Sequence, residues 1–381
     1  MSFGWAVGCA SAALLAWFIV LIAPWRPWST RECLAADAQR RREPLDDVTV
    51  LIPARDEAET LPKTLACLAD QGPGLEILVV DDQSRDSTHE IAQGSGDAGV
   101  RVISGAALPE GWTGKVWAQA QAQAFLRRPL VLLLDADIAL APGMIATLRA
   151  RLREQRLGLV SLMAELPMEG FWERLLIPAF VYFFKLVYPF SIANSPDKRV
   201  AAAAGGCVLL ELRVLDAIGG FESLRDAIID DCTLARRVKD AGFGTWIGLT
   251  RSATSHRLYH GLGDIWRMVA RTAFTQLRYS WLLLVLCTLL MLVCFLSPVL
   301  IAFSPEPLAR VIAAAAWFFM WLAYVPTLRF YRLAVAWGLL MPFIGLLFLI
   351  MTWDSARRYL LGERSAWRGR RYAAGRENVS R

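Results

Sequence analysis

The sequence predicts an α/β domain with a parallel sheet, flanked by membrane-spanning helices. Of the 381 residues, 55% are hydrophobic and only 20% are charged, with a mean hydropathy of +0.38. Soluble domains are typically about 45–50% apolar and about 25% charged. Long uncharged runs lie near both ends of the chain, and between them short apolar runs alternate with helical patterns. This pattern favours an enzyme-like α/β domain attached to a membrane.

The first apolar run predicts an N-terminal anchor. Residues 3–23 carry no charge, and about 20 such residues span a bilayer. Positive charges follow at Arg26, Arg31 and Arg40–Arg42. The positive-inside rule therefore places the N-terminus outside and the following domain in the cytoplasm. We expect a multi-pass protein of the cell inner membrane with a cytoplasmic catalytic domain.

Three further apolar runs come late, at residues 281–303, 311–327 and 333–353. If all three crossed, the C-terminal tail would lie outside, against its arginines. We therefore expect one of them, the short run 311–327, to be re-entrant or interfacial. The aromatic stretch 171–193 is interrupted by prolines and charges, which predicts an interfacial helix.

The charge distribution separates a near-neutral body from a basic tail. Residues 354–381 hold eight arginines and three acidic residues, which is +5 of the net charge of +6. A neutral body argues against a nucleic-acid groove, and a basic tail suits an anionic membrane leaflet. The seven cysteines include no CxxC pair, which excludes a zinc ribbon and gives no disulfide framework.

Four apolar runs in the middle of the chain predict strands. They cover residues 48–53, 75–81, 100–104 and 130–135, with helical patterns at 57–69, 86–93 and 115–127. Continuously apolar strands that alternate with helices indicate a parallel sheet, whose ligands bind at the carboxyl ends of the strands. There is no GxGxxG after the first strand and no GxxxxGK[ST], so an NAD-binding dehydrogenase and a P-loop NTPase lose their main support.

The fourth strand runs into Asp135 and Asp137, in the sequence VLLLDAD. Residues two apart on a strand point to the same side, so these carboxylates would repel each other without a cation between them. Mg²⁺ and Mn²⁺ prefer carboxylates together with phosphate oxygens. The motif predicts a metal–diphosphate site, and the alternative is a solvated turn whose aspartate caps the next helix.

Charged residues also follow the first two strands. Pro53, Arg55 and Glu57 come after the first, and Asp81 and Asp82 end the second. Helix capping explains Asp86 but does not explain two adjacent acids at a strand end.

Several segments, in this order, resemble the family 2 glycosyltransferases with the GT-A fold. They are IPARDEAETLPKTL, VVDDQSRDST, DAD, GGCVLLELRVLDAIGGFES and IIDDCTLARRVKDAGF, within residues 48–244. The resemblance implies a Rossmann-like mixed sheet that binds a nucleotide-diphosphate sugar. It also implies an anchor (1–24), a GT-A domain (25–280, with donor half 48–140 and acceptor half 141–280), membrane helices (281–353) and a basic tail (354–381).

The arrangement of an N-terminal anchor and C-terminal apolar helices resembles that of lipid glycosyltransferases. Among these, the chain resembles the hopanoid-biosynthesis-associated members. The tail sequence WRGRRY, residues 367–372, is similar to a basic aromatic motif of ceramide glucosyltransferase-like enzymes.

The family resemblance implies a role for each candidate residue. Glu57 and Asp82 would hold the ribose and base of the donor, with Asp81, Pro53 and Arg55 in the same donor-binding segments. Asp137 would bind Mn²⁺ or Mg²⁺, Asp135 would contact ribose or metal, and Lys115 and Arg278 would face the diphosphate. Asp231 would be the catalytic base, and Asp230 would raise the pKa of the pair. Where the family has the pair Glu-Asp, this chain has Asp230 and Asp231.

The motif of processive members, QxxRW, is incomplete. Thr275 stands in place of the glutamine and Tyr279 in place of the tryptophan, and Arg278 alone matches. This departure favours transfer of a single sugar. His256 and His260 are four apart without an obvious third zinc ligand, and His256 stays open as a metal or phosphate ligand.

The leading hypothesis is an inverting glycosyltransferase that moves one sugar to a lipid acceptor at the cytoplasmic membrane face. One alternative is a nucleotidyltransferase, which would need a glycine-rich, lysine-containing loop after the first strand, and IPARDEAE supplies none. The other is a non-catalytic membrane scaffold. Loss of the DxD motif or of Asp231 would favour the scaffold, and both are present.

Overall fold

A mixed eight-stranded sheet forms the centre of the domain. The structure is a computed structural model that describes residues 3–95, 99–367 and 370–373. The strand order is β3-β2-β1-β4-β7-β6-β8-β5. The strands are β1 (Val48–Ala54), β2 (Glu76–Asp81), β3 (Val100–Ser104), β4 (Leu130–Leu134), β5 (Ile138–Leu140), β6 (Leu157–Glu165), β7 (Cys207–Glu211) and β8 (Gly244–Ser255).

The four strands predicted from the sequence form the parallel half of this sheet. β1 pairs in parallel with β2 and β4, and β2 pairs in parallel with β3. The expectation of a purely parallel sheet is corrected by β7, which runs antiparallel to β4 and β6, and by β5, which runs antiparallel to β8. The mixed α/β sheet implied by the family resemblance is confirmed.

Helices cover both faces of the sheet because the central strands are buried on both sides. Val50 and Ile52 of β1 pack into one core with α2 (Leu61–Ala69), α3 (Thr88–Gly94) and α5 (Met144–Glu154). Leu51 points the other way, into a core with α4 (Gly114–Gln123), α8 (Leu212–Ala217), η3 (Phe221–Leu224) and α9 (Asp230–Asp240). The alternation follows from the two-residue repeat of a strand.

Among the residues that the structure describes, four helices are long and apolar enough to cross a membrane. Two of them are the single helices α1 (Phe3–Ile22) and α14 (Pro307–Phe330). The third is the run 281–301, which consists of α12 (Trp281–Met291), η4 (Leu292–Leu296) and α13 (Ser297–Ile301). The fourth is the run 335–360, which consists of η5 (Val335–Leu340) and α15 (Met341–Leu360). The remaining short elements are η1 (Ala38–Arg42), α7 (Phe190–Ala193), α10 (Leu262–Ala270), α11 (Ala273–Gln276), β9 (Glu363–Trp367) and β10 (Arg370–Ala373).

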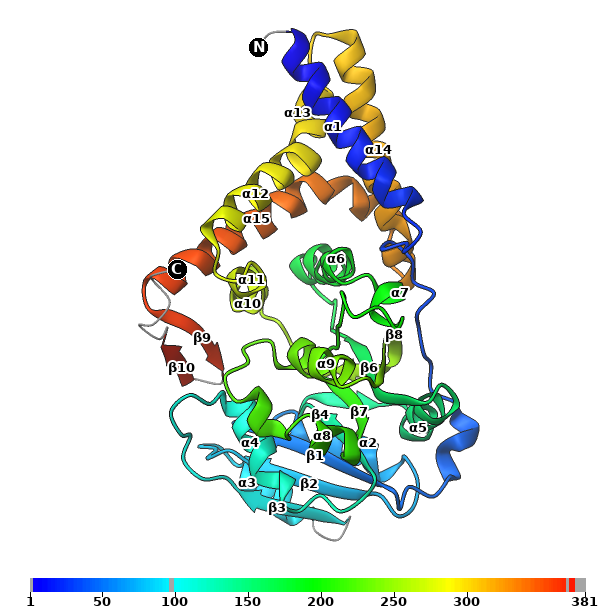
Figure 1. Cartoon of the computed structure of the whole chain (residues 1–381), viewed down its shortest axis with the longest axis vertical. Helices are drawn as coiled ribbons and strands as arrows, with labels where there is room; N and C mark the ends of the chain where they lie inside the picture. Colours follow the sequence, from blue (N-terminus) through cyan, green and yellow to red (C-terminus); the bar gives the residue numbers. More distant parts are fainter. Residues whose placement is uncertain (1–2, 96–98, 368–369, 374–381) are drawn as a thin grey trace.

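The α14 helix extends beyond the apolar run 311–327 at both ends. It is 24 residues long, because it continues past the uncharged run to include Arg310 and Arg329. It lies beside α1 along the upper part of the molecule (Figure 1). Ala6 and Ala10 of α1 pack against Ala309 and Ala313 of α14, and such small side chains let two helices approach closely.

The α15 helix runs beside α12, on the side that faces the α/β domain (Figure 1). It contacts α6 (Phe171–Val187), α10 and α11 on the domain side and α12 on the other. Of the late apolar segments, α15 therefore lies nearest the α/β domain.

The α6 helix belongs to the stretch 171–193, which was expected to face lipid. In the structure α6 lies between the domain and the apolar helices, and its contacts include α10, α14 and α15. Most of its side chains, including Glu173 and Lys185, are buried by protein. The helix continues through Pro178, and α7 forms the end of the same stretch.

The basic tail, including part of the sequence WRGRRY, lies partly outside the described residues. The structure describes a hairpin of β9 and β10 beyond residue 362, and most of the tail's charge lies outside the residues whose side chains are described.

Candidate active site

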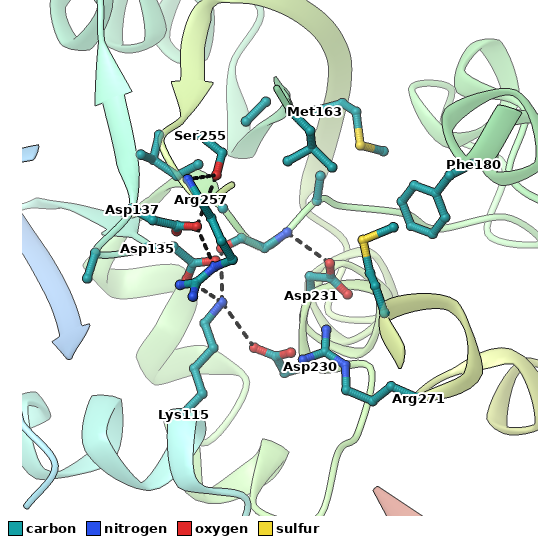
Figure 2. Close-up of a pocket in the computed structure, with 18 of the residues that line it drawn as sticks. Lys115, Asp135, Asp137, Met163, Phe180, Asp230, Asp231, Ser255, Arg257 and Arg271 are labelled. Atoms are coloured by element: carbon teal, nitrogen blue, oxygen red, sulfur yellow. Dashed lines mark hydrogen bonds and ion pairs between the residues drawn. The ribbon is translucent and has the colours of Figure 1, made fainter. Parts of the chain in front are cut away.

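One cavity of about 510 Å³ opens at the carboxyl ends of β1 and β4 (Figure 2). Seven of the site residues expected from the sequence line it: Pro53, Glu57, Lys115, Asp135, Asp137, Asp230 and Asp231. The residues that follow β1 and β4 meet because these strands are parallel neighbours, so their carboxyl ends share one edge of the sheet. Lys115 comes from the start of α4, and Asp230 and Asp231 come from the start of α9. The antiparallel strand β7 begins at that edge and brings Gly205 and Gly206 opposite Asp135, whose amide donates to the Gly206 carbonyl at 3.0 Å.

Four expected residues do not line this cavity: Arg55, Asp81, Asp82 and Arg278. Arg55 ties the ends of β1 and β2 together, since its guanidinium donates to the backbone carbonyls of Asp82 and Gln83. Asp81 accepts from the Ser84 amide at 3.3 Å and lies 3.4 Å from His89 Nδ1. These residues lie at the neighbouring strand ends, on the β2 side of Glu57.

Arg278 lies in the segment between α11 and α12, which does not line the cavity. It follows α11 and adopts a positive φ of 52° just before α12. Its neighbour Tyr279 stacks on Tyr359 of α15, with ring centroids 4.6 Å apart. This packing holds the segment against α15, away from the residues that line the cavity.

The two aspartates of the DAD sequence each meet a different cation. Lys115 Nζ lies 2.6 Å from Asp135 Oδ1, and Arg257 Nε donates to Asp137 Oδ2 at 2.9 Å. Asp137 Oδ2 also accepts from Ser255 Oγ at 3.0 Å. Burial raises the pKa of Asp135, and the charge of Lys115 opposes that shift. The carboxylates therefore point into the cavity, as Figure 2 shows, and are held by basic side chains.

Arg257 is a residue that the sequence argument missed. It follows β8 and bridges two strand ends, because its second nitrogen lies 2.8 Å from Glu57 Oε1 while its Nε contacts Asp137. Arg257 and Glu57 are 200 positions apart in the chain, so no local sequence motif predicts this bridge. Its only signal in the sequence is a charged residue directly after His256.

Asp230 and Asp231 begin α9 and face the same cavity. Asp231 accepts from the amides of Gly205 at 2.8 Å and Cys232 at 2.7 Å. Burial, and then the charge of Asp230, raise the pKa of Asp231 to about 6. Lys115 lies 3.9 Å from Asp230. Burial disfavours the charge of Lys115, but Asp135 and Asp230 outweigh it and raise its pKa. Lys115 thus links the strand-end acids to the helix-start acids.

The donor set fits a divalent cation that shares its coordination with phosphate. Asp135 and Asp137 offer hard carboxylate oxygens to the cavity. His256, left open as a ligand by the sequence, does not line the cavity, and its buried Nε2 has no hydrogen-bond partner among the described residues. Within that part of the chain, no group of three His, Cys, Asp or Glu side chains converges into a complete protein cage. Mg²⁺-type sites commonly use one or two carboxylates and complete their coordination with substrate phosphates and water. The pair therefore suits a metal that binds together with a diphosphate.

The opposite side of the cavity is apolar. Its wall includes Met163, Phe180, Phe184 and Met268, which come from β6, α6 and α10. Figure 2 places Phe180 across the cavity from Asp137, with Asp231 between them. Because α6 and α10 also pack on α15, this wall joins the acidic edge of the sheet to the apolar helices.

Two comparisons with known sequences bear on this domain. Residues 49–219, a little under half of the chain, match the family described as Glycosyl transferase family 2. A 4,4'-diaponeurosporenoate glycosyltransferase from Staphylococcus haemolyticus (strain JCSC1435) is 32% identical over 146 residues. That alignment covers 37% of this chain and 38% of the relative, so well under half of the relative's length is matched.

The fold has a counterpart among solved structures. The mannosyltransferase PcManGT from Pyrobaculum calidifontis, in complex with GDP-Man and Mn²⁺, aligns over 92% of this chain and 99% of its own. The TM-score is 0.53 and the sequence identity is 20%. A sequence identity this low supports a shared fold and nothing more. Residues 49–219 are therefore similar to glycosyl transferase family 2, and the domain has the GT-A fold.

Proposed function

We propose that the protein is a membrane-bound inverting glycosyltransferase. It moves a single sugar from a nucleotide-diphosphate sugar to a lipid acceptor. The observation that carries this proposal is the continuous cavity, which runs from Asp135 and Asp137 past Asp231 to an apolar wall on α6 and α10. A polar donor and an apolar acceptor would meet at Asp231.

The donor would bind at the strand ends. Glu57 and the neighbouring segment around Asp82 hold the nucleoside, and Lys115 binds the diphosphate. Asp135 and Asp137 hold Mn²⁺ or Mg²⁺, which neutralises the developing charge of the leaving diphosphate when bound. Arg257, which now pairs with Asp137 and Glu57, would exchange those partners for a phosphate oxygen. The nucleotide sugar and Mn²⁺ in PcManGT support this class of donor.

Asp231 would act on the acceptor. Its carboxylate takes the proton of the acceptor hydroxyl while that oxygen attacks the anomeric carbon. Two backbone amides fix its orientation, and a pKa of about 6 leaves it ionised yet basic at neutral pH. The attack displaces the nucleoside diphosphate in one step, so the configuration at the anomeric carbon inverts.

Incubation with labelled donors tests this proposal against two alternatives. The purified chain is given radiolabelled UDP- and GDP-sugars, Mn²⁺ and a membrane lipid extract. We expect labelled lipid. A parallel reaction with a nucleoside triphosphate and a sugar phosphate tests the first alternative, since release of pyrophosphate there would indicate a nucleotidyltransferase. Neither labelled lipid nor pyrophosphate would indicate a membrane scaffold.

The acceptor class is narrowed by the sequence resemblance to hopanoid-associated enzymes. We propose that a hopanoid lipid is among the acceptors. Lipid extracts from matched cells with and without hopanoids separate this from a general lipid acceptor, because only the first extract should then become labelled.

Membrane orientation is the second part of the proposal. The ends of α1, α12 and α14 nearest the domain carry arginines, at Arg26, Arg278, Arg329 and Arg332. By the positive-inside rule the domain then faces the cytoplasm, with three crossings in α1, the run 281–301 and α14. The α15 helix would lie along the inner leaflet and return the tail to the cytoplasm.

We expect the two ends of α14 to lie on opposite sides of the membrane. A cysteine placed at Ser304 should react with an impermeant thiol reagent from outside, and a reporter fused at Arg381 should be active only in the cytoplasm. Wild-type cysteines set the background for the labelling. A reporter at Arg381 that is active only in the periplasm would restore a fourth crossing by α15.

A further inference from the structure

The cavity contains a cation that the proposed chemistry has not used. Arg271 caps the C-terminal end of α10 and lines the cavity. Its guanidinium makes no hydrogen bond or ion pair with the residues that the structure describes. Arg267, one turn earlier, is occupied, because it pairs with Asp264.

Arg271 lies on the acceptor side of the cavity. In Figure 2 it reaches in beside Asp230 and lies across the cavity from Asp137. Met268 is on the same helix three residues earlier and belongs to the apolar wall. The donor side already has two cations of its own, Lys115 at Asp135 and Arg257 at Asp137. The diphosphate therefore has counter-charges without Arg271.

Neither neighbouring acid forms an ion pair with Arg271 among the described residues. Asp230 lies 3.9 Å from Lys115, and Asp231 is held by two backbone amides. An arginine at the junction of an apolar wall and a reaction centre suits an oxyanion, because its planar fork binds carboxylate and phosphate in two-pronged fashion.

We propose that the acceptors include an acidic amphiphile, with a carboxylate or phosphate beside its reacting hydroxyl, and that Arg271 binds this group. The inference rests on the proposed glycosyl transfer. The apolar tail lies along Met163, Phe180 and Met268, and Arg271 holds the acidic group so that the hydroxyl faces Asp231. The hydroxyl oxygen bonds to the anomeric carbon, its proton passes to Asp231, and the nucleoside diphosphate leaves with the electrons of the broken C–O bond.

Matched pairs of amphiphiles test the proposal by binding alone. One pair is 3-hydroxyhexadecanoate and 1,3-hexadecanediol, and the other is oleoyl lysophosphatidic acid and 1-oleoylglycerol. Within each pair the chain and a hydroxyl are shared and only one member is charged. Binding to the full chain in detergent is measured by native mass spectrometry. We expect the charged member of at least one pair to bind about 10-fold more tightly, as a charge-assisted hydrogen bond would give.

Three variants assign the preference to Arg271. Arg271→Gln should abolish the preference, and Arg271→Lys should restore part of it. Arg174→Gln is the matched control, because Arg174 is an exposed arginine on the adjacent helix α6 and does not line the cavity. It should keep the preference. Equal binding of charged and neutral members by the wild type, or equal loss in Arg174→Gln, would overturn the proposal.

Two competitors separate the sources of the anion. Saturating GDP or UDP with Mn²⁺ should leave the preference intact, and its disappearance would assign Arg271 to the donor diphosphate. Inorganic phosphate should compete only weakly, and competition as strong as that of the amphiphiles would indicate a free-anion site. If no labelled lipid forms with any donor, the proposed function fails while this binding preference is still measured. Efficient transfer to neutral lipids with no anionic preference would overturn only the inference.

Discussion

Replacement of Asp231 by asparagine should lower kcat by about 10²–10⁴-fold, the usual contribution of a general base. Asparagine keeps the shape of the side chain but cannot take the acceptor proton. Donor affinity should change little, because Asp135 and Asp137 are on the other side of the cavity. Steady-state kinetics and nucleotide binding on the purified variant separate the two effects. A variant that loses donor binding as strongly as turnover would contradict the assignment.

Asp230→Asn is the matched control for this prediction. It should cost less activity, because Asp230 influences the base only through its charge. The pKa of Asp231 is raised to about 6 by burial and then by Asp230. Below that pH the carboxyl is protonated and cannot accept a proton, so the rate should fall on the acidic side. Removal of the Asp230 charge lowers the pKa of Asp231, and the acidic limb of the pH–rate profile should move to lower pH.

A larger effect of Asp230→Asn than of Asp231→Asn on kcat would require the two roles to be exchanged. Thermal unfolding of both variants shows whether either change acts through the fold. Lys115 must be considered in the comparison, since it lies 3.9 Å from Asp230.

Asp137→Ala should abolish metal-dependent donor binding with a smaller effect on folding. Asp137 is one of the two acids that fit a metal at the diphosphate, so we expect a loss above the roughly 10–100-fold cost of removing an outer-shell partner. The side chain also holds Ser255 and Arg257, and its loss leaves Arg257 with Glu57 as its partner. Calorimetric titration with a nucleoside diphosphate and Mn²⁺ measures the binding loss.

Asp137→Asn controls for the lost hydrogen bonds, because its amide oxygen still accepts from Ser255 while the charge is gone. Wild-type protein in EDTA should resemble both variants in donor binding. Near-normal transfer by Asp137→Ala in the presence of EDTA would rule out the metal assignment. In that case Lys115 and Arg257 would be sufficient counter-charges for the diphosphate.

The acidic edge of the sheet could be predicted because it depends on local patterns. Strands of continuous apolar residues, each followed by acids, place Glu57 and Asp135 at one edge as soon as the strands are parallel. The order of the segments then indicates that Asp231 belongs to the same site. The structure brings these residues into one cavity, although no local pattern gives the register of β7 that places Gly205 beside Asp231.

The parts that could not be predicted depend on contacts between distant segments. Arg257 meets Glu57 across 200 residues, and only the course of β8 brings it there. Arg278 carries the expected residue type, but the packing of Tyr279 on α15 keeps its segment out of the cavity. Hydropathy likewise cannot separate α14 from α15, because both are apolar and differ in what they pack against.

The stereochemistry of the product tests most directly the central claim, that Asp231 activates an acceptor oxygen for a single displacement. A donor of defined anomeric configuration is incubated with the full chain and its lipid acceptor, and the new glycosidic linkage is examined by NMR. We predict the opposite anomeric configuration in the lipid product. Retention of the donor configuration would contradict the account, because it requires a mechanism other than one direct attack assisted by Asp231.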